Sequence, residues 1–115
     1  MKYRWKIFLA ELNPVRGSEQ GKTRPVIVIS NEEMNNILPV LNVLPITSKK
    51  ESRKVYINEV FLPKGIANID RDSIVLTYQI RTIDKSRLIK EIGTLEDEII
   101  KDRILESLVY QLELL

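Results

Sequence analysis

Short apolar, β-branched runs separated by polar stretches with Gly or Pro dominate the first 92 residues. This pattern predicts many short strands rather than long helices. In the first run the alternation places Trp5, Ile7 and Leu9 on one face, although Phe8 breaks it. The order indicates a mainly β fold, a small barrel. The strands are expected at 5–12, 26–30, 40–46, 73–80 and 88–92, with shorter pieces at 55–57 and 60–62.

The connections between these runs carry turn residues. Asn13-Pro14 ends the first strand and is followed by a polar loop at about 15–23. Pro25 has no amide donor, so we expect it at the start of the second strand, where the missing donor does least harm. Residues 83–88 predict a turn or a 3₁₀ segment. The first two strands are therefore joined by a long, solvated loop.

Two segments show helical signals. Residues 31–35 predict a single turn, capped by Ser30 or Asn31. Near the C-terminus, Thr94 followed by Asp97 fits a capping box. An apolar stripe with a spacing of four residues follows and predicts an amphipathic terminal helix; it consists of Ile100, Ile104, Leu108 and Leu112, with Leu105, Val109 and Leu115 beside it.

Composition narrows the chemistry. The chain has 115 residues, with 43% apolar and 30% charged, which predicts a single domain over residues 1–115 and an ordinary globular core. We expect a cytoplasmic protein with no membrane association, because the first apolar run ends too soon for a signal peptide. The chain has no Cys and no His. This excludes thiol nucleophiles, disulfides, zincins and histidine-dependent nucleases, and we expect no metal and no cofactor.

Charge is unevenly distributed. Residues 1–90 hold 16 Lys and Arg against 9 Asp and Glu, whereas residues 91–115 hold 2 against 7. A basic body suits a polyanionic partner. The acidic end equally fits a solvated helix face. Within the basic part, residues 49–54 fit either a solvated loop or a patch that steers phosphates.

Arg24 lies where the polar loop meets the second strand. A long cation mounted on a rigid strand, beside hydroxyl and amide groups, fits an anion site. Gly17 and Gly21 allow positive φ or a close approach of the backbone. The alternative is a solvated hairpin loop with a structural arginine.

Three sequence blocks together resemble the MazF/PemK toxin family. The first runs from Leu12 to Asn31 and contains Arg16-Gly17-Ser18-Glu19-Gln20-Gly21-Lys22-Thr23-Arg24-Pro25; the others are Pro45-Ile46-Thr47-Ser48 and the stretch from Asp72 to Leu88. The resemblance covers nearly the whole chain in the correct order. It implies an SH3-like, PemK-like barrel with a C-terminal helix, usually a homodimer. It also implies a sequence-specific, metal-independent endoribonuclease that cuts single-stranded messenger RNA.

The same resemblance implies roles for particular residues. Arg24 would be the acid/base and charge stabiliser, and Thr47 a phosphate ligand, once the second and third strands pair. Glu19 is the nearest carboxylate to Arg24 in sequence and is our candidate base. Some family members carry an acidic residue where this chain has Tyr78. The tyrosine puts in doubt a carboxylate acting as general base at this position, although its ring can stack on an unpaired nucleobase. The expected RNA-binding residues are Gly17, Ser18, Gln20, Lys22, Ser48, Tyr78 and Gln79.

Several alternatives stay open. Thr47 fits a hydroxyl that satisfies strand-end backbone, and Tyr78 fits a half-buried strand aromatic. Arg81, Asp84 and Arg87 match the family motif, but their alternating charges favour structural ion pairs. As a whole, the chain fits a related-fold toxin of the gyrase-poison type or a catalytically silent RNA-binding barrel. The family resemblance further implies a small acidic antitoxin as partner, with DNA bound only through it.

Overall fold

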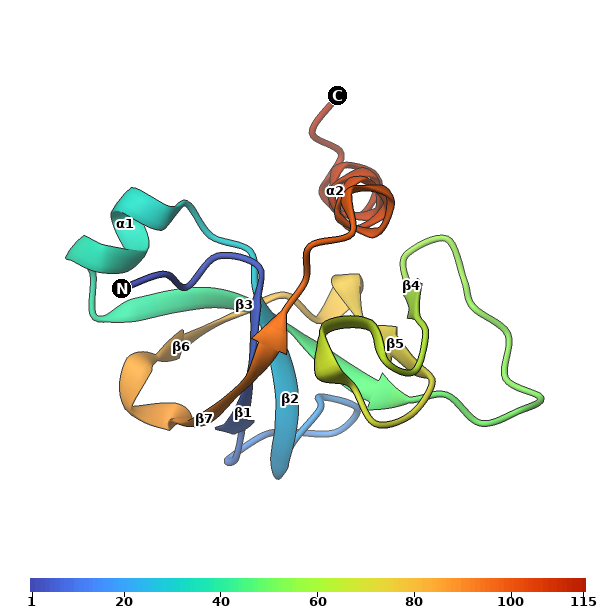
Figure 1. Ribbon diagram of the computed structural model, residues 1–115, viewed down its shortest axis with the longest axis horizontal. Helices are drawn as coiled ribbons and strands as arrows, with labels where there is room; N and C mark the ends of the chain where they lie inside the picture. Colours follow the sequence, from blue (N-terminus) through green and yellow to red (C-terminus); the bar gives the residue numbers. More distant parts are fainter.

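The computed structural model describes all of residues 1–115 as a strongly bent β-sheet with one long helix across it (Figure 1). A short helix, α1 (Glu32–Ile37), follows β2, and three 3₁₀ turns, Ile66–Asn68, Thr77–Gln79 and Lys85–Arg87, lie between the later strands. The long helix is α2 (Glu98–Leu112). The strands are β1 (Lys6–Glu11), β2 (Thr23–Val28), β3 (Val40–Ser48), β4 (Val60–Leu62), β5 (Ser73–Val75), β6 (Arg81–Asp84) and β7 (Leu88–Thr94).

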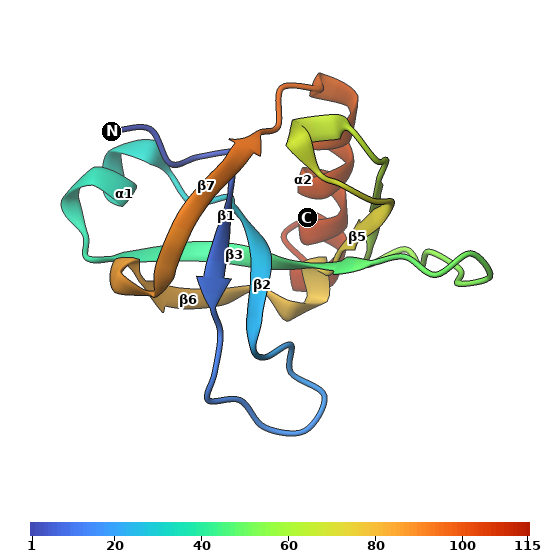
Figure 2. The ribbon, with the colours of Figure 1, turned by 60° about the horizontal axis from the view of Figure 1, so that its bottom comes forward.

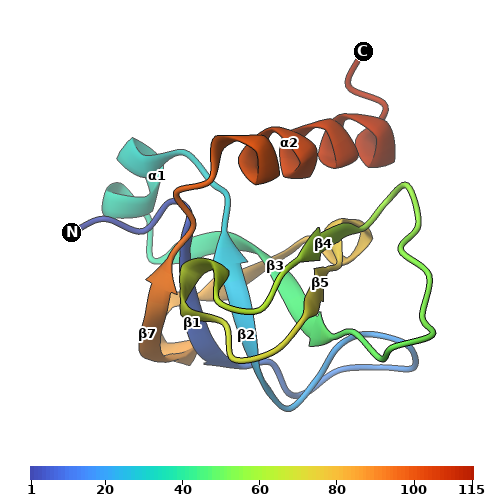
Figure 3. The ribbon, with the colours of Figure 1, turned by 45° about the vertical axis from the view of Figure 1, so that its right-hand side comes forward.

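Strand β3 organises the sheet. The strand order is β4-β5-β3-β2-β1-β7, and β6 pairs with the first half of β3. All pairings are antiparallel. The sheet curls around β3 (Figure 2), but its end strands β4 and β7 do not pair with each other (Figure 3). The expected mainly β fold with a C-terminal helix is thus confirmed, as a barrel that is not closed.

The middle strands of the sheet, β1 to β3, are buried on both faces, because they separate two apolar clusters. In β1, Ile7 enters the cluster beneath α2, whereas Phe8 and Ala10 enter the cluster on the other side. Strand β2 divides in the same way, with Ile27 on the α2 side and Val26 opposite. This explains why Phe8 broke the alternation: a strand buried on both faces has no polar face to alternate with.

Helix α2 lies across one face, above β4 and β5 (Figure 3). Three members of its predicted apolar stripe, Ile100, Ile104 and Leu108, are buried, but Leu112 is exposed. The helix begins later than expected, because its N-cap is Asp97, whose carboxylate accepts from the Ile100 amide at 3.0 Å. Thr94 ends β7 and pairs with Lys6 of β1 instead. Neither helix is both long and apolar enough to cross a membrane.

Several predicted boundaries were wrong. Residues 55–57 form no strand, and the run at 73–80 divides into β5 and a 3₁₀ turn. The buried Thr77 hydroxyl bonds the Asn58 carbonyl there, which draws the chain away from the sheet. Pro25 lies inside β2, not at its start; β2 pairs with β3 only from Val26 onward, so the missing donor breaks no bond on that side. Strand β6 was not predicted, whereas the cap of α1 is Asn31, one of the two candidates.

Candidate active site

Arg24 and Thr47 come together as the strand pairing requires. Val26 lies opposite Pro45 and Ile27 opposite Leu44, so the loop-proximal ends of β2 and β3 are neighbours. Both side chains line one cleft of about 240 Å³. The expected pairing of the two strands is therefore confirmed, and it produces a shared cleft at one end of the sheet.

The Arg24 side chain is held by one hydrogen bond, and its other donors have no partner within the chain. It is half-buried, and its Nε donates to the Gly21 carbonyl at 3.0 Å. This is the only hydrogen bond of the side chain within the chain, so both terminal nitrogens stay available to an anion. The Thr47 hydroxyl makes no hydrogen bond within the chain, while its backbone pairs with Ile74 of β5. Arg24 is thus oriented by the loop, and both groups line the cleft with hydrogen-bonding capacity left for a ligand.

The same cleft contains residues that the sequence reasoning did not single out as site residues. Asp70 and Arg71 lie on the segment before β5, and their side chains form an exposed ion pair at 3.7 Å. Ser48, already expected as an RNA-binding residue, lines this cleft as well, and the Ser73 hydroxyl there donates to the Arg71 carbonyl at 2.9 Å. The only sequence signal for the new pair was the alternating charge of Asp70-Arg71-Asp72 directly before a strand. The cleft therefore has a second cation and a carboxylate besides Arg24.

The loop between β1 and β2 owes its shape to its glycines. Gly17 has φ of +53°, which favours glycine, and a Cβ on Gly21 would lie 2.6 Å from both Asn13 Oδ1 and Val15 Cγ2. The close approach that Gly21 permits is therefore within the loop itself. Lys22 also has a positive φ, and its amide donates to Asn13 Oδ1 at 2.9 Å.

Two arginines fasten the start of this loop, and their role corrects the expectation of ion pairs. Arg81 donates to the Leu12 carbonyl at 3.2 Å. Arg87 donates to the carbonyls of Glu11 and Asn13, at 3.0 and 2.6 Å. Both guanidinium groups thus bind backbone rather than carboxylates, and hold the loop against the end of the sheet.

A second cleft, of about 360 Å³, lies beside the loop and is lined by Ser18, Glu19, Tyr78 and Gln79. Within the loop, the Glu19 carboxylate accepts a hydrogen bond from the Arg16 amide. Glu19 does not line the Arg24 cleft. Tyr78 lies on a 3₁₀ turn and is 39% exposed, so it is not a half-buried strand residue. Seven of the predicted residues therefore fall into two clefts, one lined by Arg24, Thr47 and Ser48 and the other by these four, whereas Gly17, Gln20 and Lys22 line neither.

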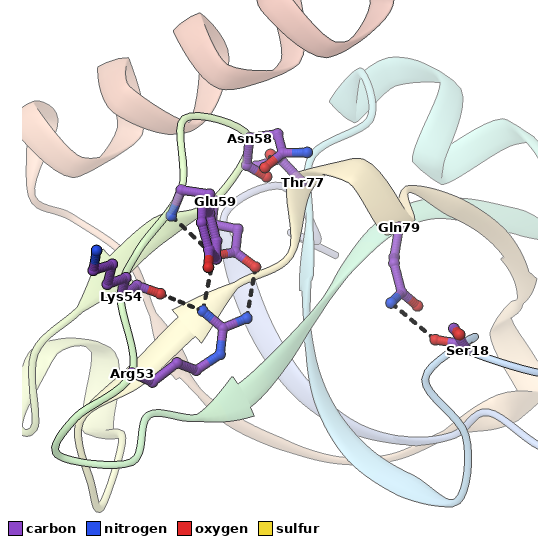
Figure 4. A network of polar contacts seen from close by, with 8 residues as sticks. Ser18, Arg53, Lys54, Asn58, Glu59, Thr77 and Gln79 are labelled. Carbon is purple, nitrogen blue, oxygen red and sulfur yellow. Dashed lines mark hydrogen bonds and ion pairs between the residues drawn. The ribbon is translucent and has the colours of Figure 1, made fainter.

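The Gln79 amide connects the second cleft to the loop. Its Oε1 accepts from the Gln20 amide at 2.7 Å. Its Nε2 donates to the Ser18 carbonyl at 3.2 Å, as Figure 4 shows. Gln20 turns inward, and its side-chain oxygen is buried with no partner. In this conformation the Gln79 side chain holds the loop through one accepted and one donated hydrogen bond.

The 49–59 segment is ordered by one buried carboxylate. Glu59 accepts two hydrogen bonds from the Arg53 guanidinium, at 2.9 and 2.7 Å (Figure 4). Arg53 lowers the pKa of Glu59, and the same contact raises the pKa of Arg53. Arg53 is thus a structural cation, whereas Lys50 and Lys54 are exposed.

The comparisons with known proteins agree with this geometry. The model of the PemK-like, MazF-like toxins of type II toxin–antitoxin systems matches residues 3–109. Endoribonuclease MazF of Staphylococcus saprophyticus is 39% identical over 102 residues, which are 89% of this chain and 84% of the relative.

The protein belongs to the MazF/PemK toxin family.

Solved structures of MazF toxins share the fold. Mycobacterium tuberculosis toxin MazF-mt6 superposes with a TM-score of 0.76 at 22% identity, covering 94% of this chain and 96% of that one. A mycobacterial endoribonuclease, solved in complex with its cognate antitoxin, gives a TM-score of 0.80 at 16% identity, covering 100% and 98%. At these identities the likeness shows the fold alone. The family expected from the three sequence blocks is nevertheless confirmed.

Acidic side chains do not form a cluster in this member of the MazF/PemK family. No three His, Cys, Asp or Glu residues lie together in an arrangement that could hold a metal ion. The two carboxylates nearest the clefts, Glu19 and Asp70, lie in different ones. Each therefore has to be considered singly as a proton acceptor.

Proposed function

We propose that this toxin cuts single-stranded RNA at specific sequences without a metal ion, leaving 2′,3′-cyclic phosphate and 5′-hydroxyl ends. The enzyme class, an endoribonuclease, follows from the family and from the 39% identical relative. The observation that carries the finer proposal is the cleft shared by Arg24 and Thr47, in which the terminal guanidinium nitrogens are free.

The reaction needs no external nucleophile. The RNA 2′-hydroxyl attacks the adjacent phosphorus, the P–O5′ bond breaks, and the 5′-oxygen leaves as a hydroxyl after taking up a proton. Arg24 neutralises the charge that builds on the phosphorane oxygens, because its planar fork matches them. The Thr47 hydroxyl donates to the same phosphate. The protein thus acts mainly by orientation and electrostatic stabilisation.

A base must remove the 2′-hydroxyl proton, and arginine stays protonated at neutral pH. We assign this role to Glu19, with Asp70 as the competing carboxylate because it lines the Arg24 cleft. Glu19→Gln and Asp70→Asn distinguish the two. The variant that lacks the base should lose the acidic limb of the pH–rate profile, while the other keeps it.

The partners are part of the proposal. A homodimer is supported by exposed apolar side chains that follow the side of α2 away from the 55–57 loop and continue to the C-terminus, namely Leu105, Leu112, Leu114 and Leu115. An acidic antitoxin is supported by the basic residues around the clefts and by the antitoxin-bound structural relative. DNA would be bound only through that antitoxin.

The test is incubation of the purified protein with a long, unstructured RNA in EDTA, with cuts mapped by primer extension and ends identified chemically. We expect cuts at one short sequence with cyclic phosphate and 5′-hydroxyl ends. Strict Mg²⁺ dependence or 5′-phosphate ends would overturn the proposal. DNA of the same sequence should stay intact, because it lacks the nucleophile. A gyrase-poison type or a silent RNA-binding barrel would leave the RNA uncut.

A further inference from the structure

Three of the four tyrosines in the chain line a single cleft of about 470 Å³. They come from three separate parts of the fold: Tyr56 from the loop before β4, Tyr78 from the 3₁₀ turn after β5, and Tyr110 from α2. Their exposed fractions are 61%, 39% and 58%. Large aromatic rings left this accessible are unusual on a small surface and mark a binding site more often than a packing defect.

The charged residues that line this tyrosine cleft neutralise each other. Arg53 and Glu59 line it, and each is bound to the other through two hydrogen bonds (Figure 4). The Arg53 guanidinium also lies 6.0 Å from the centre of the Tyr56 ring, which helps to orient that ring. Because the cation is already neutralised, the cleft has no free charge to attract a phosphate or a carboxylate. What it presents to a ligand is aromatic surface.

Tyr78 connects this cleft to the candidate active site. The same residue lines the neighbouring cleft that contains Ser18, Glu19 and Gln79. A single strand lying in that neighbouring cleft therefore reaches the tyrosine cleft by passing one side chain. Successive unpaired bases of one RNA strand have the right chemistry for such a path, since stacking on aromatic rings does not require any particular base.

We propose that the tyrosine cleft is an additional RNA subsite, in which an unpaired base outside the cleaved bond stacks against Tyr56 and Tyr110. The inference rests on the proposed RNA substrate and extends it to a position that the Arg24 cleft does not reach. Such a subsite adds affinity with little sequence preference and makes the enzyme favour substrates longer than its recognition sequence.

The experiment uses an RNA oligonucleotide that spans one mapped cut site, with a 2′-deoxy nucleotide at the cut so that it binds without being cleaved. A set of these oligonucleotides carries one abasic nucleotide at each position in turn. Binding is measured by fluorescence anisotropy for the wild type and for Tyr56→Ala, Tyr110→Ala and Tyr56→Phe. Ile89→Ala, which truncates a comparably exposed side chain on β7, is the matched control. Tyr78 is left intact because it lines both clefts.

Each alanine variant should weaken binding roughly 10-fold, on the scale of one lost stacking contact, whereas Tyr56→Phe and Ile89→Ala should not. One abasic position should cost the wild type a similar factor but cost Tyr56→Ala nothing more. If every abasic position adds fully to the Tyr56→Ala loss, the subsite does not exist.

Two further outcomes are distinguishable. If the wild type cuts RNA but Tyr56→Ala weakens only the binding of the acidic antitoxin tail, the cleft belongs to that protein and the subsite is overturned. If the all-ribose RNA is not cut by the wild type, the proposed function fails first. In that case no cut site can be mapped, and anisotropy with an unstructured all-ribose RNA decides separately whether Tyr56→Ala weakens RNA binding.

Discussion

The side-chain oxygen of Gln79 accepts a hydrogen bond of 2.7 Å from the backbone amide of Gln20, which lies 59 residues earlier in the sequence. This contact, with the bond from Gln79 to the Ser18 carbonyl, holds the middle of the β1–β2 loop against the 3₁₀ turn. A residue that the sequence suggested as a base reader is thus a positioning residue in this conformation.

Gln79→Ala should therefore loosen the loop around residues 16–21. We expect the Gln20 amide to exchange with solvent about 2- to 10-fold faster, since one net hydrogen bond contributes about 0.5–1.5 kcal/mol. Hydrogen exchange followed by NMR measures this directly. Gln79→Glu is the matched control, because it keeps the acceptor for Gln20 and loses only the donor to Ser18. Equal exchange rates in wild type and Gln79→Ala would show that the contact does not hold the loop.

Arg24→Ala should lower the single-turnover cleavage rate at least ~100-fold, the scale for removing one transition-state donor. Arg24→Lys should recover only part of this, since an ammonium keeps the charge but not the fork. Thr47→Val, which removes only the hydroxyl, should cost about 10-fold. Unfolding temperatures of all three should stay near wild type. A near-wild-type rate for Arg24→Ala would remove Arg24 from the mechanism.

The Arg53–Glu59 pair should make stability depend on pH. The pKa of Glu59 in the folded protein lies below its unfolded value of about 4.3. The pair therefore stabilises the fold fully above about pH 4.3, and this stabilisation is lost as the pH falls through the folded-state pKa. Glu59→Gln should lower the free energy of unfolding by about 1–3 kcal/mol at neutral pH and flatten its decline in acid. Denaturant unfolding between pH 3 and 7 tests this.

Glu51→Gln is the control for that measurement, since Glu51 lies exposed in the same loop and its carboxylate has no partner. It should follow the wild-type curve. Parallel curves for Glu59→Gln and the wild type in acid would show that Glu59 does not carry the pH dependence.

Exposed lysines in the 49–54 loop should steer an acidic antitoxin tail. Replacing Lys50 and Lys54 with glutamine should slow association roughly 2- to 10-fold while changing dissociation less, because peripheral charges act mainly on encounter. Arg53 stays unchanged, since it is bound to Glu59. The control replaces the exposed Lys2 and Lys90 and alters the net charge equally. Stopped-flow association that responds neither to the first pair nor to salt would exclude steering by this loop.

Local pattern predicted the β-rich fold and the C-terminal helix, because runs of apolar residues and turn residues mark both. The meeting of Arg24 with Thr47 was implied by the family resemblance, and the pairing of β2 with β3 supplies it. Local pattern gave the wrong structure where contacts between residues far apart in the sequence determine the local conformation. Residues 55–57 look like a strand but are shaped by Glu59 and by Ser107, whose hydroxyl donates to the Ile57 carbonyl. Thr94 has capping chemistry, yet its pairing with Lys6 in the sheet leaves the cap to Asp97.

The candidate site shows the same limit. Asp70 and Arg71 join the Arg24 cleft only because the chain folds back before β5, and no local pattern states that. Conversely, Glu19 is close to Arg24 in sequence but lies in the neighbouring cleft, since the loop and its Arg16 amide fix its position. Sequence distance within a loop is a poor guide to which cleft a side chain enters.

The most direct test of the central claim replaces one atom of the substrate. An RNA with a single mapped cut site is compared with the same RNA carrying a 2′-deoxy nucleotide on the 5′ side of that bond. If the Arg24 cleft promotes attack by the 2′-hydroxyl, the wild type binds both RNAs with similar affinity in EDTA and cuts only the first, leaving a cyclic phosphate. Cleavage of the 2′-deoxy substrate at the same bond would contradict the account.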